Sequence, residues 1–596
     1  MRFFLCLCFF FTLQLTSAQE DFLAKQYFSD GEYEKAAVYY EKLAKKRPRA
    51  RAYAEALIKC YQQLEEYEKA EAFINDRITL DYALPTIFIE LGYNHALQEQ
   101  PEKAKAAYEK AVASIEENPN YGFSLGARFQ EYSLLDYAIQ TYTRAMELNP
   151  TIDNNFQIAR VYGEQGAIDK MFESYLTLIQ KGRYSKSNVL RSINDFITED
   201  PENENNIKLK KILLTKAQKN PDILWNEILS WLFVQQKQYN SALNQEKAIY
   251  KRSDNGSLQR IEGLGKLALE DGIIPVAQKT FQFIVDHSDG GVTQLNAQLK
   301  LIDISLLEPN ETTQAKVQKT FDELLENYGF RNRTLQLQIA YANFLTFTKN
   351  SPEPAIELLV KTLELPLNAY GKAYVKMALG DILVFDQKFN RALIYFSQIQ
   401  KEKGLKNDVL SQNARFKVAQ TSFYKGDFDW ALTQLKVLRG STSQLIANDA
   451  MQLSLLIADN SLEDSTQTAL KKYARADLLA YQNKTKEAIT VLDDILQNHK
   501  GEKVEDEALL RQGQLLERLK EYDSARFNYL KIIEFYNTDI LADDALFALG
   551  QLYEGALNTP QKAQEYYEKI IYNHQDSYYF PQARKNYRRL RGDTIN

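Results

Sequence analysis

Few residues of this 596-residue chain have the types and spacing that catalysis or metal binding requires. The histidines are four in number and far apart in sequence, and none has a second metal ligand at the spacing of one helical turn. These residues are His95, His287, His499 and His574. We therefore expect structural or solvent-exposed histidines and no metal site.

Two other patterns resemble chemical sites but lack the surroundings that such sites need. Residues 263–266 read Gly-Leu-Gly-Lys, as in a phosphate-binding loop, but neither the preceding strand nor the remaining spacing is present. The carboxylate pairs at 493–494 and 543–544 are adjacent in sequence, so the two members of each pair would point apart on a helix. We interpret both pairs as solvated faces or helix starts, and we predict a protein that is not an enzyme and binds no cofactor.

The strongest pattern is a repeat of alanines followed four positions later by a large side chain. The alanines recur at a constant interval, at Ala36, Ala70, Ala104 and Ala138, and the large residues are Tyr40, Ile74, Tyr108 and Tyr142. A small residue lets two antiparallel helices approach closely, and the large side chain fills the space beside it. A fixed period within the range of about 20 to 50 residues predicts an all-α solenoid in which each unit packs on its neighbours.

The repeats between residue 20 and about residue 180 resemble tetratricopeptide (TPR) units. The first unit has small, aromatic, turn and helix-ending residues in the order of that motif: Ala24, Tyr27, Gly31, Tyr33, Ala36, Tyr40, Leu43 and Pro48. The third and fourth units also carry a Leu-Gly pair, at 91–92 and 125–126. The resemblance implies a TPR superhelical solenoid of antiparallel helix pairs.

The clarity of the motif changes along the chain and divides it into segments. We predict an N-terminal TPR array at 19–181, divergent helical repeats at 182–369, and a C-terminal TPR array with a capping helix at 370–596. A polar stretch that contains a proline, 197–205, predicts a loop near the first boundary. The long interval between Ala431 and Ala488 predicts an inserted piece, which we place in a linker at 459–465.

The segment 1–18 has the shape of a secretory signal peptide. Met1 and Arg2 precede an apolar run from Phe3 to Leu15, which is too short to cross a bilayer, and small residues then favour cleavage before Gln19. We expect an exported protein with no transmembrane segment after cleavage. The remaining cysteine, Cys60, then has no partner within the mature chain, and we expect it to be a buried structural residue.

The C-terminal units are similar to TPR proteins of the outer-membrane β-barrel assembly machine and of the Tol-Pal system. This resemblance implies the periplasm, or the periplasmic face of the outer membrane, of a Gram-negative bacterium, with possible peripheral association with an outer-membrane complex. The formal net charge of −6 gives no long-range field suited to nucleic acid. We therefore expect protein partners and no nucleic acid.

The resemblance also implies which residues face a partner, because first helices line the concave groove of TPR arrays. The register nominates eight positions as a partner-binding groove: Ile89, Tyr93, Phe123, Phe156, Arg160, Tyr374, Phe416 and Phe423. Asp21, Lys25, Glu55 and Lys59 do not reproduce the clamp with which chaperone-binding members hold a C-terminal carboxylate.

These patterns together predict a non-catalytic exported scaffold or adaptor that mediates protein–protein interactions in cell-envelope or outer-membrane assembly or in secretion. Two alternatives remain open. The abundant aromatic residues, 37 tyrosines and 31 phenylalanines, could stack on the sugars of peptidoglycan or another glycan. An enzyme could instead have its site in the divergent middle segment, 182–369.

Overall fold

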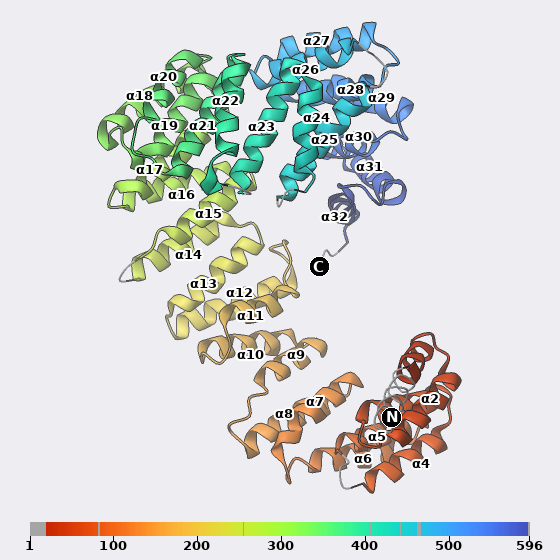
Figure 1. The fold of residues 1–596 in the computed structure, drawn as a ribbon. Coiled ribbons are helices and arrows are strands. Elements are labelled where there is room, and N and C mark those ends of the chain that lie inside the picture. Colours follow the sequence, from red (N-terminus) through yellow and green to blue (C-terminus); the bar gives the residue numbers. More distant parts are fainter. Residues whose placement is uncertain are drawn as a thin grey trace, which may run out of the picture. The chain divides into compact units, whose positions relative to one another are not determined.

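The computed structural model describes residues 19–80, 84–253, 256–405, 408–440, 443–461 and 466–593. The predicted signal peptide, residues 1–18, lies outside this part of the chain. The described residues form helices joined by short turns and contain no strand (Figure 1). The prediction of an all-α solenoid of helix pairs is confirmed. The fold divides into two compact units, unit 1 up to Lys237 and unit 2 from Gln238 onward.

Unit 1 begins with a helical stretch at residues 19–29. The helices that follow are α2 (Tyr33–Lys46), α3 (Arg51–Gln63), α4 (Tyr67–Ile78), α5 (Thr86–Leu97), α6 (Pro101–Ala113), α7 (Gly122–Glu131), α8 (Leu135–Leu148), α9 (Asn155–Glu164), α10 (Ile168–Gln180), α11 (Lys186–Asn194), α12 (Glu204–Lys219) and α13 (Ile223–Gln235). A short 3₁₀ helix, η1 (Pro119–Tyr121), precedes α7. Residues 197–203 lie outside the helices, as the polar stretch before α12 predicts.

Unit 2 continues the same alternation of helices. The first part contains α14 (Tyr239–Arg252), α15 (Gln259–Glu270), α16 (Ile274–His287), α17 (Gly291–Ser305), α18 (Glu311–Tyr328), α19 (Leu335–Asn343) and α20 (Pro352–Thr362). The second part contains α21 (Ala369–Phe385), α22 (Phe389–Gln400), α23 (Val409–Lys425), α24 (Phe428–Leu438), α25 (Gln444–Ser461), α26 (Thr468–Tyr481), α27 (Thr485–Asn498), α28 (Val504–Arg518), α29 (Tyr522–Phe535), α30 (Ala542–Glu554), α31 (Pro560–Asn573) and α32 (Phe580–Arg591). Three short helical turns are η2 (Asn332–Thr334), η3 (Phe344–Thr348) and η4 (Lys403–Leu405).

The alanine register marks the closest contact between the two helices of a repeat. All four alanines of the N-terminal period are buried, and so are the four large residues that follow them. On the facing helix a glycine makes room for the large ring: a Cβ at Gly126 of α7 would overlap the ring of Tyr142 on α8. Gly550 of α30 and Tyr567 of α31 repeat this contact in unit 2. The same packing rule therefore operates in both units, and Cys60 is buried in the unit 1 core as predicted.

The turn between the two helices of a repeat recurs with the same period as the alanines. Gly31 has a left-handed backbone with a φ of 76°, and residues 65, 99 and 133 have φ values of 58°, 57° and 56°. Those three residues are Glu65, Glu99 and Ser133, for which this conformation costs free energy. The turn geometry is thus maintained where the sequence lacks glycine.

The domain boundaries proposed at 182 and 370 stay predictions, but helix pairs do continue through the middle of the chain. Helices α15 and α16 pack on each other as an ordinary pair, with Gly265 against Phe281 and with Ala277 buried. Residues 289–290 and 309–310 lie between the end of one helix and the start of the next. The middle third is therefore built like the rest of the solenoid.

The prediction of an inserted linker at 459–465 was wrong about the form of the insertion. Most of the additional residues form α25, a helix of 18 residues, and residues 462–465 lie outside the described part of the chain. The following helix, α26, is joined to the earlier α21 by two hydrogen bonds. Tyr481 Oη donates to the Asp381 carbonyl at 3.1 Å, and Gln482 Nε2 donates to the Phe385 carbonyl at 2.6 Å. The insertion is consequently an extra helix beside a solenoid that then resumes.

Candidate functional site

First helices of consecutive repeats in unit 1 are connected by a group of charged side chains that we call the Arg128 network. The Arg128 guanidinium lies 2.6 Å from Glu55 of α3, 3.3 Å from Glu90 of α5 and 3.0 Å from Glu131 of α7. Two further cations complete the network, because Arg51 pairs with Glu55 and Lys59 lies 2.6 Å from Glu131. Three carboxylates and three cations therefore bind one another across three repeats.

Burial determines how strongly this network depends on Arg128. The Glu90 side chain is 1% exposed, and its carboxylate also accepts a hydrogen bond of 2.6 Å from Tyr132 Oη. Burial raises the pKa of Glu90, while the Arg128 charge and the Tyr132 hydroxyl act in the opposite direction. The charge of the Arg128 guanidinium thus offsets most of the cost of burying the Glu90 carboxylate. The network therefore contributes to the stability of the packed first helices.

The residues nominated in unit 1 are placed in three different environments. Tyr93 is partly buried, with its ring stacked on Tyr132 at a centroid distance of 4.1 Å. Phe123 is 57% exposed. Ile89, in contrast, is fully buried among side chains of α6, α7 and α8, so it does not reach the groove.

The last two nominated residues of unit 1 are on α9. Phe156 is partly buried between two tyrosine rings, at 5.4 Å from Tyr175 and 5.0 Å from Tyr184. Arg160 is exposed to solvent. Phe123 and Arg160 are therefore the nominated residues of unit 1 that a partner can reach most readily, and Tyr93 and Phe156 are accessible only in part.

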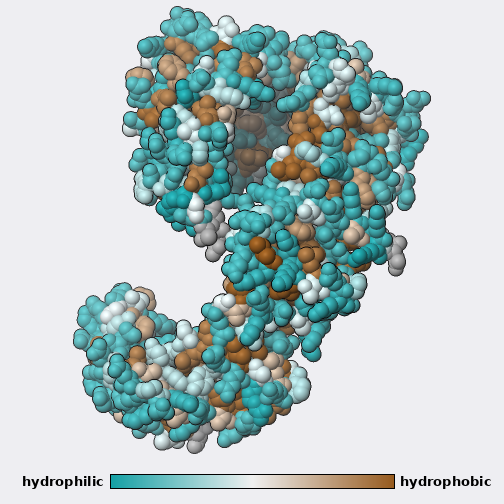
Figure 2. Space-filling view, turned by 180° about the vertical axis from the view of Figure 1, so that it is seen from behind, coloured by the Kyte–Doolittle hydropathy of each residue, from teal (hydrophilic) through white to brown (hydrophobic). Residues whose placement is uncertain are grey.

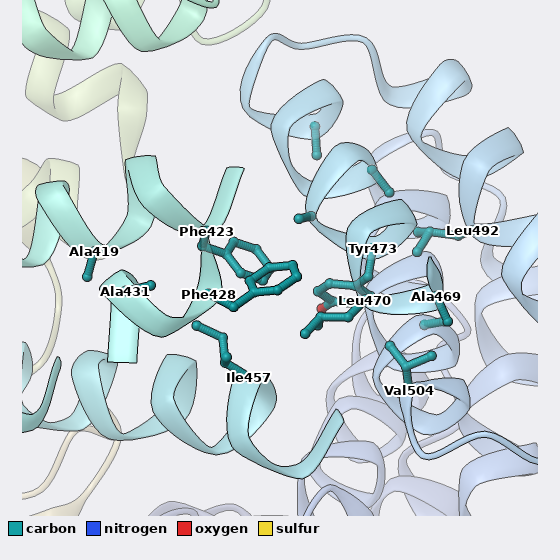
Figure 3. Close-up of a cluster of buried hydrophobic side chains, with 14 of the residues drawn as sticks. Ala419, Phe423, Phe428, Ala431, Ile457, Ala469, Leu470, Tyr473, Leu492 and Val504 are labelled. Atoms are coloured by element: carbon teal, nitrogen blue, oxygen red, sulfur yellow. The ribbon is translucent and has the colours of Figure 1, made fainter. Parts of the chain in front are cut away.

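The three nominated residues of unit 2 also differ. Tyr374 on α21 is 46% exposed, and Phe416 on α23 is partly buried at the edge of a cavity. Phe423 is a core residue: its ring lies 5.7 Å from Phe428, and both rings face Leu470 and Tyr473 of α26 (Figure 3). Helix α24 folds back over Phe423 and removes it from the groove, so this nomination is corrected together with that of Ile89.

The cavity beside Phe416, which we call the α25 pocket, has a volume of about 670 Å³. Helices α23, α25, α26 and α28 line it, together with residues 540–544 and the turn at 578–579 before α32. Hydrophobic residues gather around a hollow in the surface of unit 2, in the upper part of Figure 2. Ile457 of the inserted helix α25 is buried in the hydrophobic core near Phe428 (Figure 3).

The α25 pocket combines an apolar floor with an acidic lining. Leu453, Leu456 and Tyr473 contribute apolar surface to it. Five carboxylates line it as well, from Asp449, Asp459, Glu507, Asp543 and Asp544, whereas its described lining residues include no lysine, arginine or histidine. The sequence nominated Phe416 but none of the lining residues on α25, because the insertion was expected to be a linker and not a helix.

Desolvation affects several of these carboxylates. Burial raises the pKa of Asp449, and burial together with the nearby Asp506 raises the pKa of Glu507. Burial raises the pKa of Asp544 to about 6, with Asp543 acting in the same direction and the Tyr579 hydroxyl opposing it. Asp543 and Asp544 are in the first turn of α30, as the helix-start interpretation predicts, but Asp544 is not on a solvated face.

The divergent middle segment contains a smaller cavity of about 300 Å³, between α15, α16, α17 and α19. Its charged lining residues pair with their own neighbours: Lys266 lies 2.6 Å from Glu262, and Lys300 lies 2.8 Å from Asp303. Its described lining contains no histidine or cysteine.

The described residues contain no group of three or more histidine, cysteine, aspartate or glutamate side chains placed to hold a metal ion. Within the same residues, none of the helices combines the length and the apolar composition that a membrane span needs.

Comparison with known proteins gives one curated relative and two solved structures of interest. The human protein O-mannosyl-transferase TMTC1 is 24% identical over 177 residues, which cover 28% of this chain and 20% of that protein. The structure of Naa15/Naa10 bound to HypK-THB matches 97% of this chain and 96% of its own, at 14% identity and a TM-score of 0.26. The APC/C hetero-tetramer Cut9-Hcn1 matches 96% of both chains, at 12% identity and a TM-score of 0.21.

These matches differ in what they support. The chain spans about one fifth of the length of TMTC1, so the transferase activity in that name belongs to the relative. The TM-scores of the two solved structures are too low to carry an argument. Family models described as tetratricopeptide repeat match residues 23–79, 473–540 and 544–577. Both units of this all-α chain therefore contain tetratricopeptide repeats.

Proposed function

We propose that the protein is a non-catalytic scaffold that holds protein partners along the first helices of its repeats. The observation that carries this proposal is that ion pairs and hydrogen bonds join the first helices of consecutive repeats. The Arg128 network joins α3, α5 and α7 in unit 1. In unit 2, Asp477 of α26 accepts hydrogen bonds from Tyr424 of α23 at 3.2 Å and from Arg511 of α28 at 2.5 Å.

Such lateral bonding keeps side chains from several repeats in one continuous surface. Tetratricopeptide repeats typically mediate protein–protein interactions, and extended segments and helices both fit surfaces of this kind. The absence of a convergent catalytic grouping in the described cavities also favours a scaffold. The transferase named as a distant relative is the reason to include an activity measurement among the controls.

Photo-crosslinking tests the scaffold directly. A photoreactive amino acid replaces Phe123 or Tyr374, which are 57% and 46% exposed, in the full-length chain in its native cells. Matched controls replace Val38 of α2 and Ile394 of α22, which are 51% and 57% exposed on second helices. We expect the same identified proteins to be captured repeatedly from 123 or 374 and not from the controls. Equal capture from all four positions would contradict the proposal.

We further propose that the scaffold works in the cell envelope of a Gram-negative bacterium, in outer-membrane assembly or in secretion. The signal-like N-terminus and the resemblance of the C-terminal repeats support this location. Cell fractionation and N-terminal sequencing of the mature protein test it. A periplasmic or outer-membrane protein that begins at Gln19 is expected, and a cytoplasmic protein that retains Met1 would contradict it.

A further inference from the structure

We propose that the α25 pocket binds a segment of a partner protein that carries lysine or arginine next to apolar side chains. This inference rests on the scaffold function proposed above and names the chemistry of one partner. It depends on the shape of the pocket, on the exposed apolar side chains at its edge, and on the distribution of charge within it.

Large apolar side chains are exposed to solvent at the edge of the pocket. Tyr578 is 81% exposed and Ile540 is 62% exposed, and both line the pocket above the floor formed by Leu453, Leu456 and Tyr473. Exposed aromatic and aliphatic side chains beside a concave apolar floor are typical of protein-binding sites. A volume of about 670 Å³ that opens to solvent accommodates several side chains of one segment, which favours a peptide or a helix edge.

The charge of the pocket selects among possible segments. Its five carboxylates come from three elements: Asp449 and Asp459 from α25, Glu507 from α28, and a pair from the start of α30. The guanidinium of Arg511, also on α28, is engaged with Asp477 at 2.5 Å and with Gln514 Oε1 at 3.2 Å. The negative potential of the described lining is therefore complementary to a cationic partner.

The aspartates of the lining are the groups that favour a cationic segment. Glu507 adds little to this preference, because burial and the adjacent Asp506 raise its pKa well above the usual range of a carboxyl, so it retains its proton more readily. Asp449, Asp459 and the pair at 543–544 remain in the lining, where a lysine or arginine side chain would pair with them. The same lining disfavours an acidic segment by repulsion.

Two labelled probe peptides of opposite charge test this selectivity against the full-length chain. One is three copies of Leu-Lys-Lys-Leu, and the other is three copies of Leu-Glu-Glu-Leu. Fluorescence anisotropy should show that the lysine peptide binds at least about tenfold more tightly than the glutamate peptide. Comparable binding of the two peptides would overturn the inference.

A charge-neutralised variant locates the binding in the pocket. The triple substitution Asp449→Asn, Asp459→Asn and Asp543→Asn should weaken the lysine peptide by about 10- to 100-fold. The control triple Asp429→Asn, Glu487→Gln and Glu565→Gln changes the net charge equally at exposed positions of α24, α27 and α31. It should leave the affinity within about twofold, since long-range charge contributes little at physiological salt. Equal losses in the two variants would overturn the inference.

A further variant tests whether the exposed apolar side chains at the edge of the pocket contribute to peptide binding. Tyr578→Ala removes a side chain that is 81% exposed, so the fold should be unaffected, and it should weaken the lysine peptide by about fivefold. Unchanged affinity would overturn the apolar part of the inference. Displacement of the peptide by spermidine at equal charge concentration would also overturn it, in favour of a small organic cation. These outcomes are separate from the scaffold function, which photo-crosslinking from Phe123 and Tyr374 decides.

Discussion

The Arg128 network of unit 1 and the α25 pocket of unit 2 both gather several acidic side chains, but only the network also contains cations that pair with them. In the network three carboxylates are matched by three cations of the same chain. In the pocket five carboxylates line one cavity whose described lining contains no cation. The cavity beside the network is also smaller, at about 110 Å³ compared with about 670 Å³.

This difference indicates that charge on a repeat surface serves two purposes. Matched charges connect neighbouring first helices and stabilise the stack, whereas unmatched charges in a large cavity are available to a partner. Loss of a matched charge in the network should therefore lower stability, whereas neutralisation of a desolvated carboxylate in the pocket should not lower it. The variants below test this division, beginning with the largest expected effect.

Removal of the central cation should be the most damaging change. Arg128→Met leaves Glu90, whose side chain is 1% exposed, without its guanidinium. We expect the free energy of unfolding of unit 1 to fall by about 3 to 5 kcal/mol, because a buried charge is left uncompensated. Hydrogen exchange of the α5 and α7 amides in the full-length chain measures the loss.

A double variant determines whether the buried charge is the cause. Arg128→Met combined with Glu90→Gln removes both charges, and the introduced amide can still accept the hydrogen bond from Tyr132. The double variant should recover more than about half of the lost stability. If Arg128→Met alone leaves the exchange rates of α5 and α7 unchanged, the network is not a structural element.

The helix contacts inside the repeats should respond alike in the two units, because their geometry is the same. A methyl group added at Gly126 would overlap the Tyr142 ring, and one added at Gly550 would overlap the Tyr567 ring. Gly126→Ala and Gly550→Ala should each lower the unfolding free energy by about 1 to 3 kcal/mol, as overpacked contacts do. Thermal unfolding followed by circular dichroism compares the variants.

Gly263 supplies the matched control for these contacts. It lies within α15, and a Cβ there would meet no atom within 4 Å. Gly263→Ala should raise the unfolding free energy by about 0.5 to 1 kcal/mol, since alanine favours the helix. A loss of stability similar to that of Gly126→Ala would show that the tyrosine contact is not the source of the effect.

The sequence predicted the packing of the repeats well because the constraint there is local and periodic. An alanine at a fixed position must face a large residue across two helices, so the period itself identifies Ala36, Ala104 and their equivalents as buried. The turn was harder to predict. Glycine marks it at Gly31, but the left-handed conformation recurs at Glu99 and Ser133 through helix packing and without any glycine signal.

The groove was predicted less well because a small rotation about the helix axis separates exposed positions from buried ones. Ile89 and Tyr93 are one turn apart on α5, yet Ile89 is buried by neighbouring helices and Tyr93 is partly exposed. The α25 pocket depends on contacts between segments far apart in sequence, from Phe416 to Tyr579. The long interval between Ala431 and Ala488 signalled an insertion, but its helical form and acidic lining depend on that tertiary packing.

The buried carboxylate of Asp544 provides a pH-dependent test of the pocket. Burial raises its pKa from 3.8 to about 6, so the folded state retains the proton to a higher pH than the unfolded state does. Its contribution to stability is therefore present at low pH and is lost as the pH rises through about 6. Asp544→Asn should raise the unfolding free energy by about 1 to 2 kcal/mol near neutral pH and leave it unchanged near about pH 3.5.

The asparagine variant retains an acceptor for the Tyr579 hydroxyl, which donates to Asp544 at 2.8 Å. The change should therefore report the charge and not the hydrogen bond. Thermal unfolding as a function of pH measures it. A stability gain of equal size at both pH values would contradict desolvation of this carboxylate, and with it the distinction between the pocket and the Arg128 network.

The smallest expected effect concerns the turns, where the two units should not differ at all. Glu99 in unit 1 and Gln387 in unit 2 have φ values of 57° and 56°, a conformation that glycine adopts without steric cost. Glu99→Gly and Gln387→Gly should each raise the unfolding free energy by about 0.5 to 1 kcal/mol, because relief of this strain exceeds the added entropy of the unfolded chain. Lys103→Gly, at an exposed position inside α6, should instead lower it by about 1 kcal/mol. Opposite signs at residues 99 and 103 would show that helix packing holds residue 99 in a strained left-handed conformation, whereas a loss at both would mean that the glutamate side chain stabilises its turn.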